Sequence, residues 1–122
     1  MARPQQNIEF VRGDTLPIPI EFYDFKDNPL DITGNVLWIT LKKNVSDRDA
    51  DAVFQKRIVC PENTDSMNGT GLVVLTSAET KLLNPGVYLY DIQHVIPGDP
   101  PVVSTPMSGT IKIHPDITQN DG

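Results

Sequence analysis

Residues 75–93 read LTSAETKLLNPGVYLYDIQ, and this stretch carries the strongest structural signal in the chain. An apolar run ends at Leu75, and Thr76 with Glu79 then has the spacing of a capping box. In that arrangement the Thr hydroxyl accepts from one free backbone N–H of a helix, and the Glu carboxylate accepts from another. Pro85-Gly86 follows and starts the alternating sequence VYLYDI. The stretch therefore predicts a strand, one helical turn and a second strand in close succession.

The tyrosines of the second strand indicate how the two strands are joined. Tyr88 and Tyr90 lie two residues apart, so they share one face of the strand. A tyrosine near the start of a strand, after such a crossover, is typical of the tyrosine corner of immunoglobulin-like sandwiches. We expect a structural corner made by four residues: Thr76, Glu79, Gly86 and Tyr88. The Tyr88 hydroxyl is expected to bond to the backbone within residues 80–83.

The rest of the chain alternates short apolar runs with turns rich in Gly and Pro, which predicts an all-β, immunoglobulin-like antiparallel β-sandwich. We expect seven to eight strands, with one short helical turn before the penultimate hairpin, in these stretches: 7–11, 15–23, 36–41, 53–59, 71–75, 87–96, 102–104 and 109–113, with a break near Pro106. Residues 61–71 are predicted to be a loop. One domain at 7–114 is expected between a flexible N-terminal arm at 1–6 and a polar C-terminal tail at 115–122.

Two prolines predict where one sheet ends. Pro17 and Pro19 lie in an alternating strand, TLPIPIEFY, at positions that aim their backbone nitrogens at the same neighbour. Because proline has no N–H to donate, this strand should be an edge strand on that side.

Composition limits the functions that the chain can have. The 122 residues carry a net charge of −6, which disfavours direct binding to nucleic acid. No apolar run is long enough to span a membrane, and the start, MARPQQNIEF, lacks the apolar core of a secretory leader. Cys60 is the single cysteine, so no disulfide can form within the chain; we interpret it as a small buried side chain.

Two motifs known from other proteins have simpler structural explanations here. The tripeptide RGD at 12–14 would be an integrin ligand in a matrix protein, but it lies between two predicted strands, where Gly and Asp favour a turn. Asp47, Asp49 and Asp51 alternate like calcium ligands. The Gly and bidentate Glu of an EF-hand loop are absent, so we predict a solvated loop.

No set of residues predicts catalysis, a metal site or a cofactor. His94 and His114 are the only histidines, and two nitrogens without a third ligand make a poor zinc site. No G-x-S-x-G motif occurs, and neither histidine has the setting of a nucleophilic triad. We expect that the protein is not an enzyme.

Trp38 has two alternative orientations, because both faces of its strand, VLWITL, are apolar. If Leu37 and Ile39 face the core, Trp38 points outward and is an interface anchor, since tryptophan is enriched at binding hot spots. In the other register it is the buried tryptophan that immunoglobulin domains place near the core. We favour the buried orientation. Tyr23 and Phe25 are further interface candidates.

Several motifs in order resemble a known family. They are FVRGDTLPI at 10–18, DITG at 31–34, GLVVLT at 71–76, TKLLNPGVYLYDIQ at 80–93 and GTIKI at 109–113. Together they resemble the small immunoglobulin-like domains of tailed-bacteriophage virion proteins, such as the N-terminal domain of baseplate upper proteins. No receptor-binding or fibre region follows the domain here, so we expect a stand-alone accessory or adaptor.

The resemblance implies a structural virion protein in the tail, baseplate or neck. Its implied partners are other phage virion proteins and further copies of itself in a symmetric assembly, with no direct nucleic acid and no membrane. The implied location is the virion, after synthesis in the host bacterial cytoplasm. Two alternatives stay open: a carbohydrate- or host-surface-binding module, and a capsid decoration or head–tail connector role.

Overall fold

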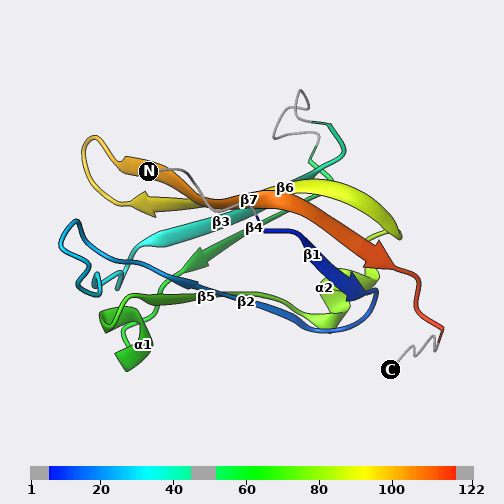
Figure 1. The fold of residues 1–122 in the computed structure, drawn as a ribbon, viewed down its shortest axis with the longest axis horizontal. Helices are drawn as coiled ribbons and strands as arrows, with labels where there is room; N and C mark the ends of the chain where they lie inside the picture. The colour runs from blue at the N-terminus through cyan, green and yellow to red at the C-terminus, as the bar shows by residue number, and fades with distance from the viewer. Residues whose placement is uncertain (1–5, 45–51, 118–122) are drawn as a thin grey trace.

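Two β-sheets pack face to face in the computed structural model, which describes residues 6–44 and 52–117 (Figure 1). Within these residues the elements are β1 (Ile8–Val11), β2 (Leu16–Glu21), β3 (Val36–Lys42), β4 (Phe54–Val59), α1 (Thr64–Met67), β5 (Thr70–Leu75), α2 (Ser77–Lys81), β6 (Gly86–Ile96) and β7 (Val102–His114). Residues 1–5 of the predicted N-terminal arm, residues 118–122 of the predicted C-terminal tail, and the aspartates at 47, 49 and 51 lie outside the described residues.

The strand order confirms the all-β, immunoglobulin-like sandwich. One sheet has the order β1-β7-β6-β3-β4 and the other contains β2 and β5. In chain order, β3, β6 and β7 therefore match strands C, F and G of an immunoglobulin domain, and β4 extends that sheet as strand C′ does in variable domains. The prediction that the sandwich is antiparallel is wrong for one strand pair, because β1 pairs in parallel with β7. Sequence alternation gives the face of a strand but not the direction of its neighbour.

Two local predictions also need correction. The stretch at 61–71 is not all loop: it contains the single turn α1, whose N-cap Asn63 accepts from the Ser66 N–H at 2.8 Å. No break occurs near Pro106, since β7 is one strand of 13 residues. The pairing of β7 with β6 shifts register between Ile92 and His94, and this local irregularity lets β7 continue as one strand past Pro106.

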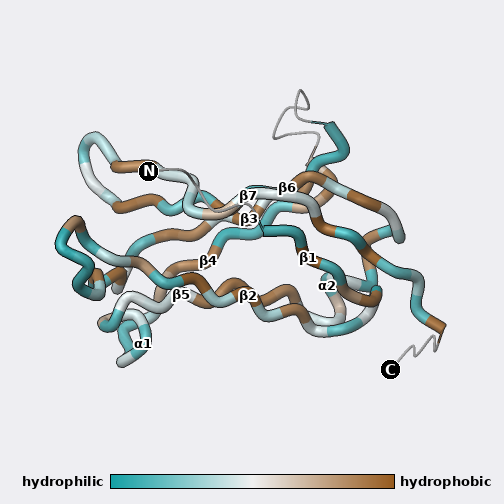
Figure 2. The backbone as a smooth tube through the Cα atoms, viewed as in Figure 1, coloured by the Kyte–Doolittle hydropathy of each residue, from teal (hydrophilic) through white to brown (hydrophobic). Residues whose placement is uncertain are grey.

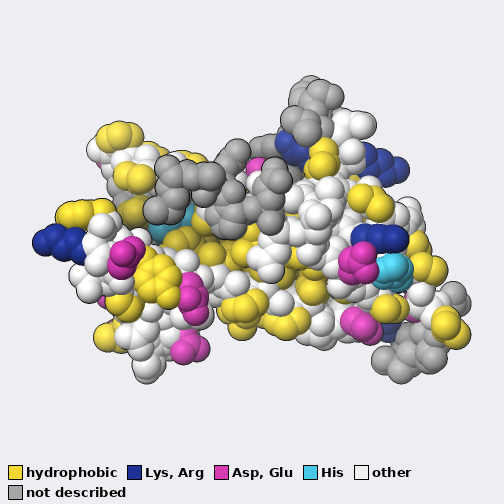
Figure 3. Space-filling view, viewed as in Figure 1, with side chains coloured by type: hydrophobic (Ala, Val, Ile, Leu, Met, Phe, Trp, Pro, Cys, Tyr) yellow, Lys and Arg dark blue, Asp and Glu magenta, His cyan; other side chains and the backbone are white. Residues whose placement is uncertain are grey.

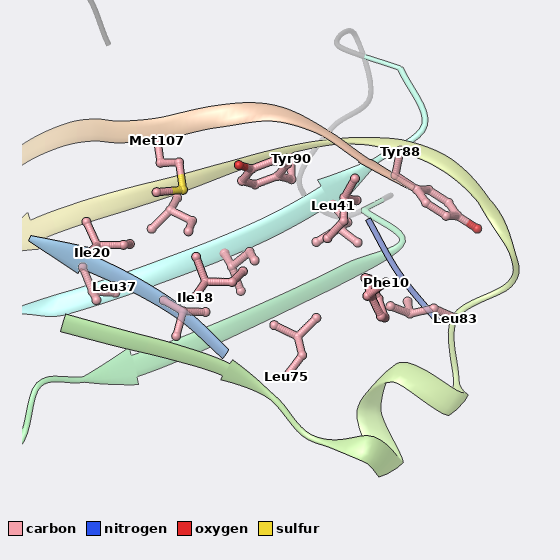
Figure 4. Packing of buried hydrophobic residues seen from close by; sticks show 14 of the residues in the cluster. Phe10, Ile18, Ile20, Leu37, Leu41, Leu75, Leu83, Tyr88, Tyr90 and Met107 are labelled. Carbon is pink, nitrogen blue, oxygen red and sulfur yellow. The ribbon is translucent and has the colours of Figure 1, made fainter. Parts of the chain in front are cut away.

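Apolar side chains from both sheets fill the interior. Along β2 the buried Ile18 and Ile20 alternate with exposed prolines, as the sequence pattern predicts (Figure 2). Figure 4 shows the packing of the core, which includes Ile18, Leu37, Leu41, Leu75, Tyr90 and Met107.

The edge prediction for β2 agrees with the strand pairing. β2 pairs only with β5, and the Phe22 N–H donates to the Gly69 carbonyl at 2.7 Å. In β2, the backbone N–H groups of residues an even number of positions from Phe22 therefore point toward β5. The backbone nitrogens of Pro17 and Pro19 point away from β5. The two prolines remove two donors from the open side of this strand.

The favoured orientation of Trp38 is wrong. Leu37, Ile39 and Leu41 are fully buried and face β2 and β5, so Trp38 lies on the outer face of the five-stranded sheet and is only partly buried. Its register neighbours are Arg57 on β4 and Gln93 on β6. Leu37, Ile39 and Leu41 fill the space between the sheets, and because side chains alternate along a strand this leaves the indole on the outside.

Candidate interaction surfaces

The corner joins α2 to the start of β6. The Tyr88 ring is buried, and its hydroxyl donates to the Asn84 carbonyl at 2.7 Å, one residue beyond the range predicted from the sequence. Gly86 has a φ of 149°, and a Cβ there would lie 3.9 Å from the Tyr88 ring. The tyrosine thus closes over the glycine that starts the strand.

Thr76 and Glu79 form both hydrogen bonds of a capping box at α2. The Glu79 N–H donates to Thr76 Oγ1 at 3.2 Å, and the Thr76 N–H donates to Glu79 Oε1 at 2.8 Å. Lys56 Nζ lies 2.7 Å from the same Oε1 and also donates to the Val74 carbonyl at 2.6 Å. Burial opposes ionisation of Glu79, but the hydrogen bonds from Lys56 and Thr76 outweigh it and lower its pKa. Lys56 therefore ties the edge of one sheet to the edge of the other.

The RGD tripeptide is a structural turn that docks on α2. The Gly13 N–H donates to Thr80 Oγ1 at 3.0 Å, and Ser77 Oγ donates to the Gly13 carbonyl at 2.6 Å. Gly13 has a φ of 91°, a conformation that glycine adopts without strain. Thr80 Oγ1 also donates to the Asp14 carbonyl at 2.9 Å.

Arg12 joins three separate segments at this corner. Its guanidinium donates to the carbonyls of Lys81 at 2.5 Å and Leu83 at 3.1 Å, where α2 ends, and it pairs with Asp116 at 3.2 Å. Because these three contacts hold the guanidinium against the domain, the tripeptide is not displayed as an adhesion ligand. The local sequence around Arg12 does not predict these contacts, because their partners lie about 70 and 100 residues further along the chain. Arg12 does lie in the first motif of the phage resemblance.

A second tyrosine holds the beginning of the described chain. Tyr90 Oη donates to the Gln6 carbonyl at 2.6 Å, and the Gln6 N–H donates to the Ser108 carbonyl at 2.9 Å. A Cβ on Gly109 would come within 2.4 Å of the Gln6 carbonyl oxygen, so only glycine allows this close approach. Gln6, which the sequence placed in the arm, is therefore fixed to the sandwich, as is Asp116 of the predicted tail.

The two histidines lie in different surroundings. His94 is buried, its ring centroid lies 4.5 Å from that of Phe22, and its Nε2 lies 3.0 Å from Asn35 Nδ2. Burial lowers the pKa of His94. His114 is at the surface, 3.3 Å from Glu9. Within residues 6–44 and 52–117, no three His, Cys, Asp or Glu side chains are grouped to hold a metal.

Cys60 is buried, and burial raises the pKa of its thiol. A thiol in this state is a poor nucleophile. The surroundings of Cys60 therefore give no support for a reactive thiol.

Tyr23 and Phe25 lie together on the turn that connects β2 to β3. Phe25 is 92% exposed and Tyr23 is 54% exposed. Asp24 fixes the turn: its carboxylate accepts from the N–H groups of Lys26 at 2.8 Å and Asn28 at 3.0 Å. Lys26 Nζ lies 5.6 Å from the centre of the Phe25 ring, a cation–π distance. The turn thus displays an aromatic ring on a hydrogen-bonded backbone, whereas Trp38 lies on a sheet face.

Three comparisons with known proteins bear on this fold. No protein-family model matches the chain, and no curated protein matches it. Among solved structures, the N-terminal domain of phage TP901-1 ORF48 is similar, with a TM-score of 0.53 at 12% identity over 89% of this chain and 85% of that one. The chain has the fold of that phage domain. At such low identity, the likeness extends to the fold alone.

Two further solved structures have weaker similarity. Tim-2 matches with a TM-score of 0.48 at 10% identity over 98% of this chain and 100% of that one. The extracellular domain of the voltage-gated sodium channel beta4 subunit matches with a TM-score of 0.42 at 10% identity over 96% and 97%. In the part of the chain that the structure describes, neither helix is long and apolar enough to cross a membrane.

Proposed function

We propose that the chain is a structural virion protein of a tailed bacteriophage, located in the tail, baseplate or neck, and that it has no catalytic role. The observation that carries the proposal is the fold shared with the N-terminal domain of phage TP901-1 ORF48 over most of both chains. The order of sequence motifs that resembles phage immunoglobulin-like domains supports the same assignment.

The contacts made by those motifs suit a mechanical part. Arg12 and Tyr90 each bond to backbone carbonyls of distant segments, and Tyr88 bonds to the carbonyl of Asn84 in the preceding crossover. The Tyr90 bond holds Gln6 to the sandwich, and the Arg12 ion pair holds Asp116. Such ties resist unravelling from the ends of the domain, because pulling on either end must first break bonds to the core.

The proposed partners are other virion proteins and further copies of this chain. A net charge of −6 makes the packaged genome an unsuitable direct partner. Protein surfaces are better suited to the exposed aromatic side chains, since aromatic residues are enriched where proteins bind each other.

The test is to find the protein in particles. Phage particles from cells that carry the gene would be purified by density gradient, and the protein would be counted by quantitative mass spectrometry against the major capsid protein. Labelled antibody and negative-stain imaging would then locate it. A fixed copy number with label at the tail tip or neck is the expected result. Absence from purified particles would refute the proposal, and label over the head would indicate capsid decoration instead.

A carbohydrate- or host-surface-binding module is the second candidate function. The supporting observation is the exposed pair Tyr23 and Phe25 on one turn, since aromatic rings can stack on sugars. The Tyr23 hydroxyl already donates to Glu21 at 2.6 Å, which leaves its ring face as the part that could bind. A glycan array with the parent and Phe25→Ser would decide: specific binding lost in the variant supports this candidate, and no binding refutes it.

A further inference from the structure

The outer face of the five-stranded sheet carries an apolar row that spans four strands. By register, Val59 on β4, Val36 on β3, Val95 on β6 and Val103 on β7 are consecutive neighbours. Val59 and Val103, at the two ends of the row, are 49% and 54% exposed, whereas Val36 is buried and Val95 is half-buried. Trp38 lies two residues from Val36 on the same face. We call these four valines and Trp38 the Trp38 face.

Arg57 is an exposed cation beside the Trp38 face. It is the register neighbour of Trp38 on β4, and its side chain is exposed. Among the described residues it has no ion pair, whereas Arg12 and Lys56 each have a carboxylate partner. The face therefore combines apolar surface with an exposed arginine that has no ion pair among the described residues, while Lys42 on β3 and Asp91 on β6 lie on the same outer face.

A complementary surface lies at one end of the sandwich. The turn at 21–31 is joined to the neighbouring segment at 62–69 by a hydrogen bond from the Phe22 N–H to the Gly69 carbonyl at 2.7 Å. Just after the turn, the Ile32 N–H donates to the Ser66 carbonyl at 3.0 Å. These two segments contain one lysine and six carboxylates: Lys26, Glu21, Asp24, Asp27, Asp31, Glu62 and Asp65. Their net charge of −5 compares with −6 for the whole chain.

Exposed apolar side chains accompany this charge. Phe25 and Tyr23 on the turn and Met67 on α1 are all exposed. Figure 3 shows hydrophobic side chains between acidic ones at the left-hand end, where the connection between β2 and β3 lies in Figure 1. We call residues 21–31 and 62–69 the acidic end.

We propose that the acidic end of one copy docks on the Trp38 face of a second copy, with the Phe25 ring against Trp38 and the valine row. The inference deepens the proposed function, on which it rests, by naming the contact between copies. Charge complementarity supports it, because the acidic end carries six carboxylates and Arg57 has no ion pair among the described residues. Rigidity supports it too, since the Asp24 hydrogen bonds hold the turn before binding and reduce the entropy lost on association.

The contact joins two different surfaces, so it is heterologous. After a single contact forms, one copy still has a free Trp38 face and the other still has a free acidic end. A heterologous contact closes into a ring or continues as a filament, according to the rotation between copies. A symmetric ring around a phage tail is consistent with such a contact.

The test measures self-association of the purified full chain by sedimentation at increasing concentration, up to about 1 mM. Two variants each remove one surface: Phe25→Ser alters the acidic end, and Trp38→Thr alters the Trp38 face. Leu82→Ser is the matched control, because Leu82 is 81% exposed and lies at the C-cap of α2, outside both surfaces. Melting curves first establish that every variant is folded.

The expected result is self-association in the parent and in Leu82→Ser, and association weaker by at least about tenfold in Phe25→Ser and Trp38→Thr. Mixing the two weakened variants should restore one intact contact and give heterodimers that grow no further. Arg57→Glu should weaken association as well, and raising the salt concentration should weaken it in the parent.

Three results would overturn the inference. A parent that stays monomeric over the whole range has no such contact. Association that survives Phe25→Ser but not Trp38→Thr indicates face-to-face pairing instead. Failure of the mixed variants to form heterodimers also excludes the docking of one surface on the other. None of these results bears on whether the protein is present in purified virions, so the proposed function is tested separately.

Discussion

Arg12 offers the sharpest test of how the corner is stabilised. Its guanidinium donates to the carbonyls of Lys81 and Leu83 and pairs with Asp116. Hydrogen bonds with a charged donor contribute about 1.5–3 kcal/mol each, whereas a partly exposed ion pair contributes about 0–1 kcal/mol. Since the Arg12 side chain is 30% exposed, the lower end of the first range applies to both carbonyl bonds.

The substitution Arg12→Met keeps much of the apolar stem and removes all three contacts. We expect the free energy of unfolding to fall by about 3 kcal/mol. For a domain of this size, each kcal/mol lowers Tm by about 4 °C. Arg12→Lys should recover only part of the loss, because an ammonium group lacks the fork that reaches both carbonyls. The assay is urea unfolding followed by far-UV circular dichroism, analysed as a two-state transition.

Two controls separate the contributions. Asp116→Asn removes only the ion pair and should cost less than about 1 kcal/mol. Asp14→Ala changes the third residue of the same tripeptide and should be nearly neutral. The Asp14 side chain is exposed, and the bond from Thr80 goes to the backbone carbonyl, which alanine keeps. A loss below about 0.5 kcal/mol in Arg12→Met would refute the reasoning, because the two carbonyl bonds would then be replaced by water without cost.

Three further predictions concern other parts of the fold. Tyr88→Phe leaves the Asn84 carbonyl without its donor and should lower the free energy of unfolding by about 1–3 kcal/mol; a change within error in urea unfolding would contradict the corner. The double variant Pro17→Val with Pro19→Val restores two donors to an open edge, so it should aggregate more than the parent in light scattering, and equal monodispersity would contradict the edge assignment. Burial lowers the pKa of His94 in the folded protein, so as pH falls the unfolded chain takes up the His94 proton at a higher pH than the folded chain does. The free energy of unfolding of the parent should therefore fall as pH drops below about 6.5, by up to about 1.4 kcal/mol per pH unit, and this fall should be absent in His94→Leu. The same dependence of stability on pH in both proteins would contradict the assignment.

Local spacing was enough to predict several features. The capping box of Thr76 and Glu79 depends on residues three apart, and the helix they begin is where the sequence indicated. The alternation along β2 and the missing donors of Pro17 and Pro19 are likewise properties of a single segment. For the same reason the sandwich itself was predictable, because each strand carries its own period and its own turn residues.

Contacts between distant segments were not predictable from the sequence. Trp38 lies in a strand with two apolar faces, so alternation could not select the core face, and the packing against β2 and β5 decided it. The parallel direction of β1 depends on its neighbour β7, about a hundred residues away. The role of Arg12 arises because its guanidinium meets carbonyls 69 and 71 residues further along the chain.

The sequence by itself therefore determined most of the strands and the cap of α2, because each of these depends on the chemistry of neighbouring residues. The tertiary structure alone decided which face of β3 is buried and which partners Arg12 and Tyr90 find. It also decided that the Trp38 face and the acidic end are separate surfaces. These features follow from how two sheets pack together, and packing depends on the shape of all the side chains at once rather than on the spacing of a few.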